Sequence, residues 1–184
     1  MTTKNIYPHL NWISLGWNCD PRISLKNQYK TGRSNGYRTH PFDLCISPPS
    51  AVEDLLEHNF ETFFKGLRVC TWGNASGNRS NAGPGGTAIT NDVGIVFNHE
   101  GGGHSHLFFE GRNDDEFYIR NNFHKFRQRY EQRIKNFKNT LIKYDDICFL
   151  YKDSSKYSKL NENSIINSIY KHYGNKTITF LHIR

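Results

Sequence analysis

The sequence predicts an α/β fold with three layers, in which helices flank a mainly parallel sheet. Residues 145–151 and 176–182 are apolar segments of strand length, and residues 161–173 between them have the apolar period of a helix. A strand, a helix and a strand joined by short links form a βαβ unit, whose strands are parallel and whose crossover is right-handed. Residues 11–15 add a buried strand that leads directly into a helix, which continues the alternation.

Two helix starts are expected in the first third of the chain. Asp20 can cap a helix in which Pro21 occupies the first turn, and Gly32 would end that helix. Ser50 and Glu53 have the spacing of a capping box, which predicts a second helix from this point.

The middle of the chain contains two glycine-rich stretches and the longest predicted helix. Residues 71–92 are expected to form a flexible Gly/Asn-rich loop, followed by a strand at 93–97 and a second short strand at 107–109. Residues 120–143 predict a helix with one continuous apolar face. That face consists of Phe123, Phe126, Tyr130, Ile134, Phe137 and Leu141.

The positive charge of the chain is confined to the long helix. The 184 residues have a net charge of +7, and residues 120–143 account for all of it.

No apolar run reaches the ~18 residues that a membrane span needs, and the aromatic content argues against a disordered chain. We therefore expect residues 1–184 to form a single domain. Without a recognisable signal peptide, we expect a cytoplasmic, intracellular protein whose four cysteines are free thiols.

Cys19 is the first candidate for chemistry. It lies between a buried strand and a helix start, where free backbone N–H groups and the helix dipole favour an anion. A thiol in that position is expected to have a lowered pKa and to act as a nucleophile. The alternative is that Cys19 is a small buried apolar residue, as we expect for the other three cysteines.

The sequence offers two other kinds of site. His99, His104 and His106 are weak candidates for a metal site, because the three glycines between His99 and His104 exclude the helical spacing of zinc proteases. A flexible turn with exposed histidines is the favoured interpretation, and we expect no cofactor. The alternative function is a transferase-like or binding module for a phosphorylated or sugar ligand. It would use the glycine-rich turns and the basic helix, which carries Arg127, Arg133 and Lys138.

The sequence resembles the "putative papain-like cysteine peptidase" family, a domain of unknown function in bacteria and large DNA viruses. The resemblance rests on Ser14-Leu-Gly-Trp-Asn-Cys19 and on Pro41-Phe-Asp43, and it continues through the helix 126–134. One departure is Leu44, where the family motif usually has Trp. The family name implies a papain-like α+β fold, whereas the strand–helix alternation favours α/β.

The resemblance implies a function and a site. Cys19 would be the nucleophile of a peptidase-like hydrolase or acyl transferase, and His99 would be its general base. His40 competes with His99, and Asp43 or Glu100 could orient either ring. The expected substrate is a peptide or a small acyl compound, and nucleic acid is not expected as a partner. The sequence does not indicate the oligomeric state.

Overall fold

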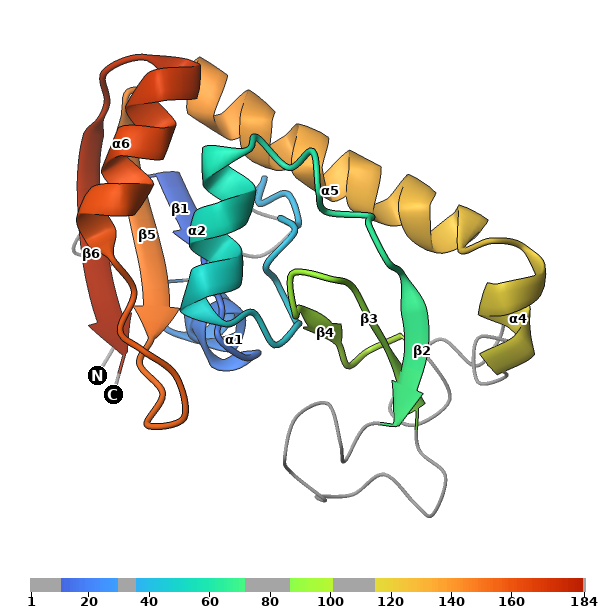
Figure 1. Ribbon diagram of the computed structural model, residues 1–184. Helices are drawn as coiled ribbons and strands as arrows, with labels where there is room; N and C mark the ends of the chain where they lie inside the picture. Colours follow the sequence, from blue (N-terminus) through green and yellow to red (C-terminus); the bar gives the residue numbers. More distant parts are fainter. Residues whose placement is uncertain (1–10, 30–35, 72–86, 101–114, 184) are drawn as a thin grey trace.

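The computed structural model describes residues 11–29, 36–71, 87–100 and 115–183, which form five helices and six strands (Figure 1). In chain order these are β1 (Asn11–Ser14), α1 (Asp20–Asn27), α2 (Pro49–Glu57), β2 (Arg68–Thr71), β3 (Thr87–Thr90), β4 (Val96–Phe97), α4 (Asp115–Arg120), α5 (His124–Lys143), β5 (Asp146–Lys152), α6 (Glu162–Tyr173) and β6 (Thr177–Ile183). No helix in these residues is long and apolar enough to cross a membrane.

A parallel sheet combines the first strand of the described residues with the last two. Its strand order is β1-β5-β6, and β5 pairs in parallel with both neighbours. The register pairs Asn11 with Ile147, and Asp146 with Thr177. The predicted βαβ unit is confirmed, since α6 connects the parallel strands β5 and β6.

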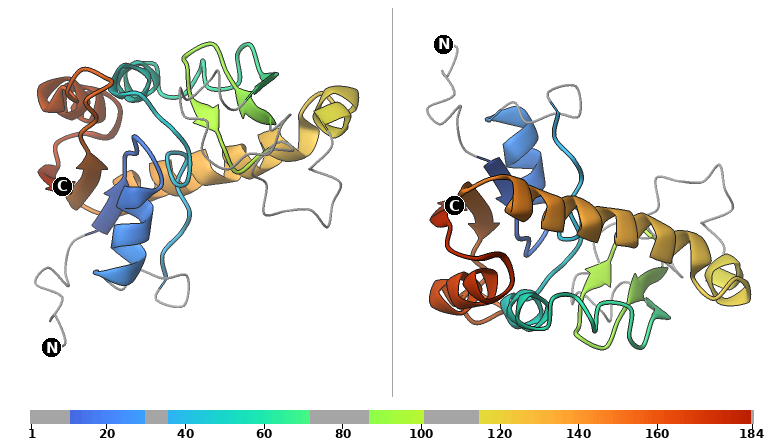
Figure 2. Two further views of the ribbon diagram at one scale, coloured as in Figure 1. Left: turned by 90° about the horizontal axis from the view of Figure 1, so that it is seen from below. Right: turned by 90° about the horizontal axis from the view of Figure 1, so that it is seen from above.

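Helices lie against this sheet on two opposite sides. Ile147 and Phe149 of β5 belong to the main core, together with residues of α2, α5 and α6. Cys148 and Leu150, which alternate with them along the strand, pack with Trp12 and with Leu25 of α1. Figure 2 shows α1 and α6 on opposite sides of the strands. A strand that is buried on both faces explains the nearly continuous apolar run of β5.

A second sheet, which the sequence did not predict, is antiparallel. Its strand order is β2-β3-β4, and a single bridge between Ile46 and Val96 ties it to the segment before α2. Only residues 96–97 of the predicted strand 93–97 form a strand, because the backbone turns at 91–94 and the Asn91 side chain accepts a hydrogen bond from the N–H of Ile95. β3 falls in the predicted loop 71–92, whereas 72–86 and the predicted strand 107–109 lie outside the described residues.

Three predicted helix starts differ from the structure. In α1 the N-cap is Cys19 rather than the predicted Asp20, which is the first residue of the helix. The predicted capping box at Ser50 and Glu53 is wrong, because α2 begins at Pro49 and its N-cap residue is Pro48. Proline is pre-organised for the first helical turn, and the Glu53 carboxylate instead accepts a hydrogen bond from the N–H of Asn161. The long basic helix begins at His124 rather than at residue 120, because left-handed backbone at Asn122 and Phe123 separates it from α4.

The long helix α5 connects the two sheets. Its predicted apolar face is buried: Phe126, Tyr130, Ile134, Phe137 and Leu141 all lie in the main core. The ring of Phe97 in β4 lies 4.8 Å from that of Phe126 and 4.7 Å from that of Tyr130, centroid to centroid. At its other end α5 leads directly into β5 (Figure 1). The fold is thus a mixture of helices with a parallel and an antiparallel sheet, and a three-layer arrangement of the chain as a whole stays a prediction.

Candidate active site

Cys19 is the N-cap residue of α1, five positions after the end of β1. The Asn18 side chain accepts a hydrogen bond from the N–H of Asp20 at 2.9 Å and donates one to the Asp20 carboxylate at 3.0 Å. Lys152, at the end of β5, forms an ion pair with the same carboxylate at 2.7 Å. The carboxyl ends of two parallel strands therefore fix the turn that holds Cys19.

His99 meets Cys19 from the antiparallel sheet. The Sγ of Cys19 lies 3.2 Å from Nε2 of His99, a contact between residues 80 positions apart. The Nδ2 of Asn98 donates a hydrogen bond to the same sulfur at 3.7 Å. Both side chains follow β4 directly. Of the two histidines considered in the sequence, His99 is the one that contacts the cysteine. Asn98 was not predicted.

The turn that carries these two side chains is anchored on both sides. Phe97 precedes it and is fully buried against α5. Glu100 follows it, with a side chain that is only 3% exposed, and accepts two hydrogen bonds from Arg129 of α5 at 3.0 and 2.6 Å. The hydroxyl of Tyr118 in α4 donates a third at 2.9 Å. The ion pair and the aromatic packing hold the turn 98–99 against the sulfur of Cys19.

The environment of Cys19 raises the pKa of its thiol above the ordinary value. Burial is the largest cause, and the negative charges of Asp20 and Asp43 act in the same direction, whereas the hydrogen bond from Asn98 lowers the pKa. The sequence-based expectation of a lowered pKa is therefore wrong, because desolvation of the thiolate and the two nearby carboxylates disfavour ionisation more than the Asn98 hydrogen bond favours it. Cys19 is a neutral thiol at neutral pH, so its activation requires a base in contact with the sulfur.

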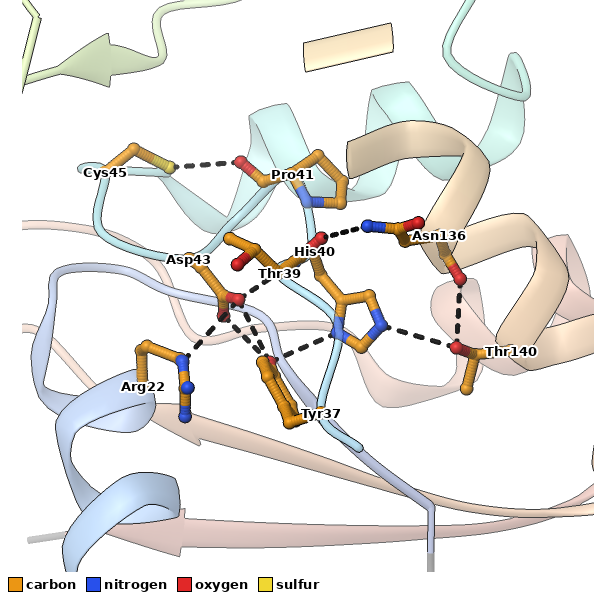
Figure 3. A network of polar contacts seen from close by, with 9 residues as sticks. All are labelled: Arg22, Tyr37, Thr39, His40, Pro41, Asp43, Cys45, Asn136 and Thr140. Atoms are coloured by element: carbon orange, nitrogen blue, oxygen red, sulfur yellow. Dashed lines mark hydrogen bonds and ion pairs between the residues drawn. The ribbon is translucent and has the colours of Figure 1, made fainter. Parts of the chain in front are cut away.

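His40 lies in a separate buried network (Figure 3). Its Nδ1 is 3.2 Å from the hydroxyl of Tyr37, and its Nε2 is 3.4 Å from the hydroxyl of Thr140 in α5. Burial, with a smaller effect of the Arg22 charge, lowers the pKa of His40 to about 3. The imidazole is neutral, and its contacts join the segment 37–43 to α5.

Asp43 belongs to the same network. Its carboxylate accepts hydrogen bonds from the Tyr37 hydroxyl at 3.1 and 3.0 Å and from the backbone N–H of His40 at 2.9 Å. The Nε of Arg22 lies 3.8 Å away (Figure 3). Complete burial raises the pKa of Asp43 to about 6, despite these donors. The contacts of Asp43 tie it to His40 and Tyr37, and those of Glu100 tie it to Arg129 and Tyr118.

The network predicts two pH effects of opposite sign. Between about pH 4 and 6, folded Asp43 holds a proton that the unfolded chain releases, so its contribution to stability falls as pH rises. Over the same range unfolded His40 binds a proton that the folded chain does not, so its contribution rises with pH. The two contributions offset each other in the unmodified chain.

Single substitutions should reveal each contribution separately. The free energy of unfolding of an Asp43→Asn variant, relative to the unmodified chain, should rise by about 1.4 kcal/mol per pH unit between pH 4 and 6. A His40→Asn variant should show a slope of similar size and opposite sign. Urea unfolding at several pH values across this range measures both slopes. If the free energy of unfolding of each variant changes with pH as it does in the unmodified chain, the pKa shifts assigned to Asp43 and His40 are contradicted.

The other candidate residues do not form a second site in the described residues. No group of three His, Cys, Asp or Glu side chains there could hold a metal ion, and His104 and His106 lie outside the described residues. Cys45 and Cys148 are fully buried, and burial raises the pKa of each, to about 12 for Cys148. These two cysteines are core residues, as expected.

The basic side chains of α5 mostly contact this chain itself. Arg133 lies over the ring of Tyr130 at 4.5 Å, and Arg127 lies over that of Phe64 at 5.5 Å. Lys138 donates a hydrogen bond to the carbonyl of Asn59 at 3.1 Å. The residues considered for phosphate contacts are thus half-buried and engaged in packing, so this helix offers no specific support for the alternative function as a binding module.

The comparison with protein families agrees with this geometry. The model of the family described as "Putative papain-like cysteine peptidase" matches residues 10–184, which include Cys19, Asn98 and His99. Neither a curated protein nor a solved structure matches the chain. The family match extends over nearly the whole chain, from β1 to β6. The chain therefore belongs to the putative papain-like cysteine peptidase family.

Proposed function

We propose that the protein is a cysteine-dependent hydrolase or acyl transferase, with Cys19 as nucleophile and His99 as general base. The observation that supports this most is the 3.2 Å separation between Sγ of Cys19 and Nε2 of His99. A base must lie within hydrogen-bond reach of the proton that it removes, and a neutral thiol requires such a base. The family match supports the same chemistry.

The proposed reaction proceeds through a thioester. His99 Nε2 takes the proton of the Cys19 thiol while the sulfur attacks the carbonyl carbon of the substrate. The imidazolium then gives that proton to the leaving amine or alcohol as the tetrahedral intermediate collapses. In the second half, His99 removes a proton from water or from another acceptor, which attacks the thioester and releases the acyl group. The thiol regains its proton from His99.

A cavity next to the site is our candidate for part of the substrate. It has a volume of about 400 Å³ and lies beside α1 at the carboxyl ends of β5 and β6. Its lining includes Asp20, which follows Cys19 directly, together with Lys152 and His182. Ligands of parallel sheets bind at this edge, and the volume suits a small acyl group or part of a peptide. Its charged lining favours a polar substrate.

Acylation of individual cysteines tests the proposed function. The protein is incubated with p-nitrophenyl acetate at neutral pH, and the acetylated residues are identified by mass spectrometry. We expect an acetyl thioester at Cys19 that forms faster than one at Cys70. Cys70 is a suitable internal control because it is also half-buried, and its sulfur contacts the carbonyl of Ala88 at 3.5 Å. Acetylation of Cys70 with Cys19 unmodified would refute the proposal.

A further inference from the structure

We propose that Asn98 is a third catalytic residue, whose side-chain N–H stabilises the Cys19 thiolate as it forms. This inference rests on the proposed function, because the thiolate matters only if Cys19 is the nucleophile. Asn98 touches the reacting sulfur itself, with Nδ2 at 3.7 Å from Sγ. It lies one position before His99, so one short turn supplies both the base and the donor.

The three groups form a consistent set of hydrogen bonds. In the resting state the thiol donates to Nε2 of His99, which requires the His99 tautomer with the proton on Nδ1. The sulfur meanwhile accepts from Nδ2 of Asn98. After proton transfer the sulfur has lost its own hydrogen but keeps the donor, and the contact becomes a charge-assisted hydrogen bond. Such bonds are roughly twice as strong as neutral ones, so Asn98 stabilises the thiolate more than the thiol.

The charges around Cys19 give this donor its importance. Burial and the carboxylates of Asp20 and Asp43 all disfavour the thiolate, and the Asn98 hydrogen bond is the one contribution among those resolved that favours it. The donor is also held in place. Asn98 is 6% exposed and lies between the buried Phe97 and the ion-paired Glu100. A fixed donor requires little reorganisation when the charge appears.

A comparison with Asn91 separates a catalytic asparagine from a structural one. Asn91 is buried and uses both ends of its amide: Nδ2 donates to the carbonyl of Phe63 at 2.8 Å, and Oδ1 accepts from the N–H of Ile95 at 2.9 Å. Within the described residues, Asn98 uses only its N–H, toward sulfur, and its buried Oδ1 has no hydrogen-bond partner. An amide selected for folding would satisfy both groups, as Asn91 does.

The test is the pH dependence of Cys19 alkylation by iodoacetamide, followed by mass spectrometry. In an Asn98→Ala variant we expect the midpoint of this profile to move up by about one pH unit, which makes alkylation about tenfold slower below the midpoint. An Asn98→Asp variant keeps the shape of the side chain but replaces the donor with a negative charge. Its midpoint should move further in the same direction. This isosteric variant also carries the test if the alanine variant does not fold.

The possible outcomes separate this inference from the proposed function. An Asn91→Asp variant is the matched structural control, and it should lower thermal stability without moving the alkylation midpoint. Unchanged midpoints in both Asn98 variants would refute the role of Asn98, even if Cys19 still forms a thioester. If Cys19 forms no thioester in the unmodified chain, the proposed function fails. The alkylation midpoints of the Asn98 variants then still show whether Asn98 stabilises the Cys19 thiolate.

Discussion

Replacing His99 with alanine is expected to slow acetylation of Cys19 by p-nitrophenyl acetate roughly 10²- to 10⁴-fold at neutral pH, the usual contribution of a positioned general base. The reason lies in the protonation state of the sulfur. Burial raises the pKa of the Cys19 thiol, so few molecules hold a thiolate without help. His99 is the base in contact with that sulfur, and without it the reaction depends on this minor population.

The pH dependence gives this prediction a second, independent readout. The difference between the His99→Ala variant and the unmodified chain should shrink as pH rises, because hydroxide then generates the thiolate without a base. Imidazole added to the solution should restore part of the rate. A His40→Asn variant is the matched control, since His40 is also buried but contacts Tyr37 and Thr140. Equal losses in the two histidine variants would contradict the assignment of His99.

The parts of the fold that were predicted are those with a local pattern. The apolar face of α5 and the strand–helix–strand unit at the end of the chain were predicted because each pattern lies within a short window. The antiparallel sheet was not predicted, because β4 has two residues and β2 pairs with β3 across a segment of 15 residues. A strand that short has no period, and its pairing depends on contacts between distant residues.

The candidate site shows the same division. Cys19 was singled out by its position between a strand and a helix start, and His99 by the family resemblance and by the end of a strand. Its neighbour Asn98 carried no pattern of its own, since its contact to Cys19 spans 79 positions. The direction of the thiol pKa was also wrong, because the helix start is visible in the sequence whereas the burial of the sulfur depends on the packing of 98–99 against it.

The ion pair between Glu100 and Arg129 is expected to be the most costly charged contact to break in the described part of the chain. The Glu100 side chain is 3% exposed and that of Arg129 is 23% exposed. An Arg129→Met variant keeps the apolar stem but leaves the Glu100 carboxylate buried, with its hydrogen bond from the Tyr118 hydroxyl at 2.9 Å and without the guanidinium charge. Removing one partner of a buried pair lowers the free energy of unfolding by about 3–5 kcal/mol.

Urea unfolding of three variants tests whether this loss comes from the stranded charge. A Glu100→Gln substitution added to Arg129→Met should recover part of the stability, because the neutral amide can still accept from Tyr118. Lys171→Met is the control for an exposed ion pair. The side chains of Lys171 and Glu57 are 54% and 46% exposed, so loss of this pair should change the free energy of unfolding little. A similar effect of Arg129→Met and Lys171→Met would contradict the prediction.

The same variants should change the reaction of Cys19. Because Glu100 adjoins His99, Arg129→Met should also slow Cys19 acetylation. If the ion pair acts by holding the turn 98–99 in place, the double variant should regain both stability and acetylation rate.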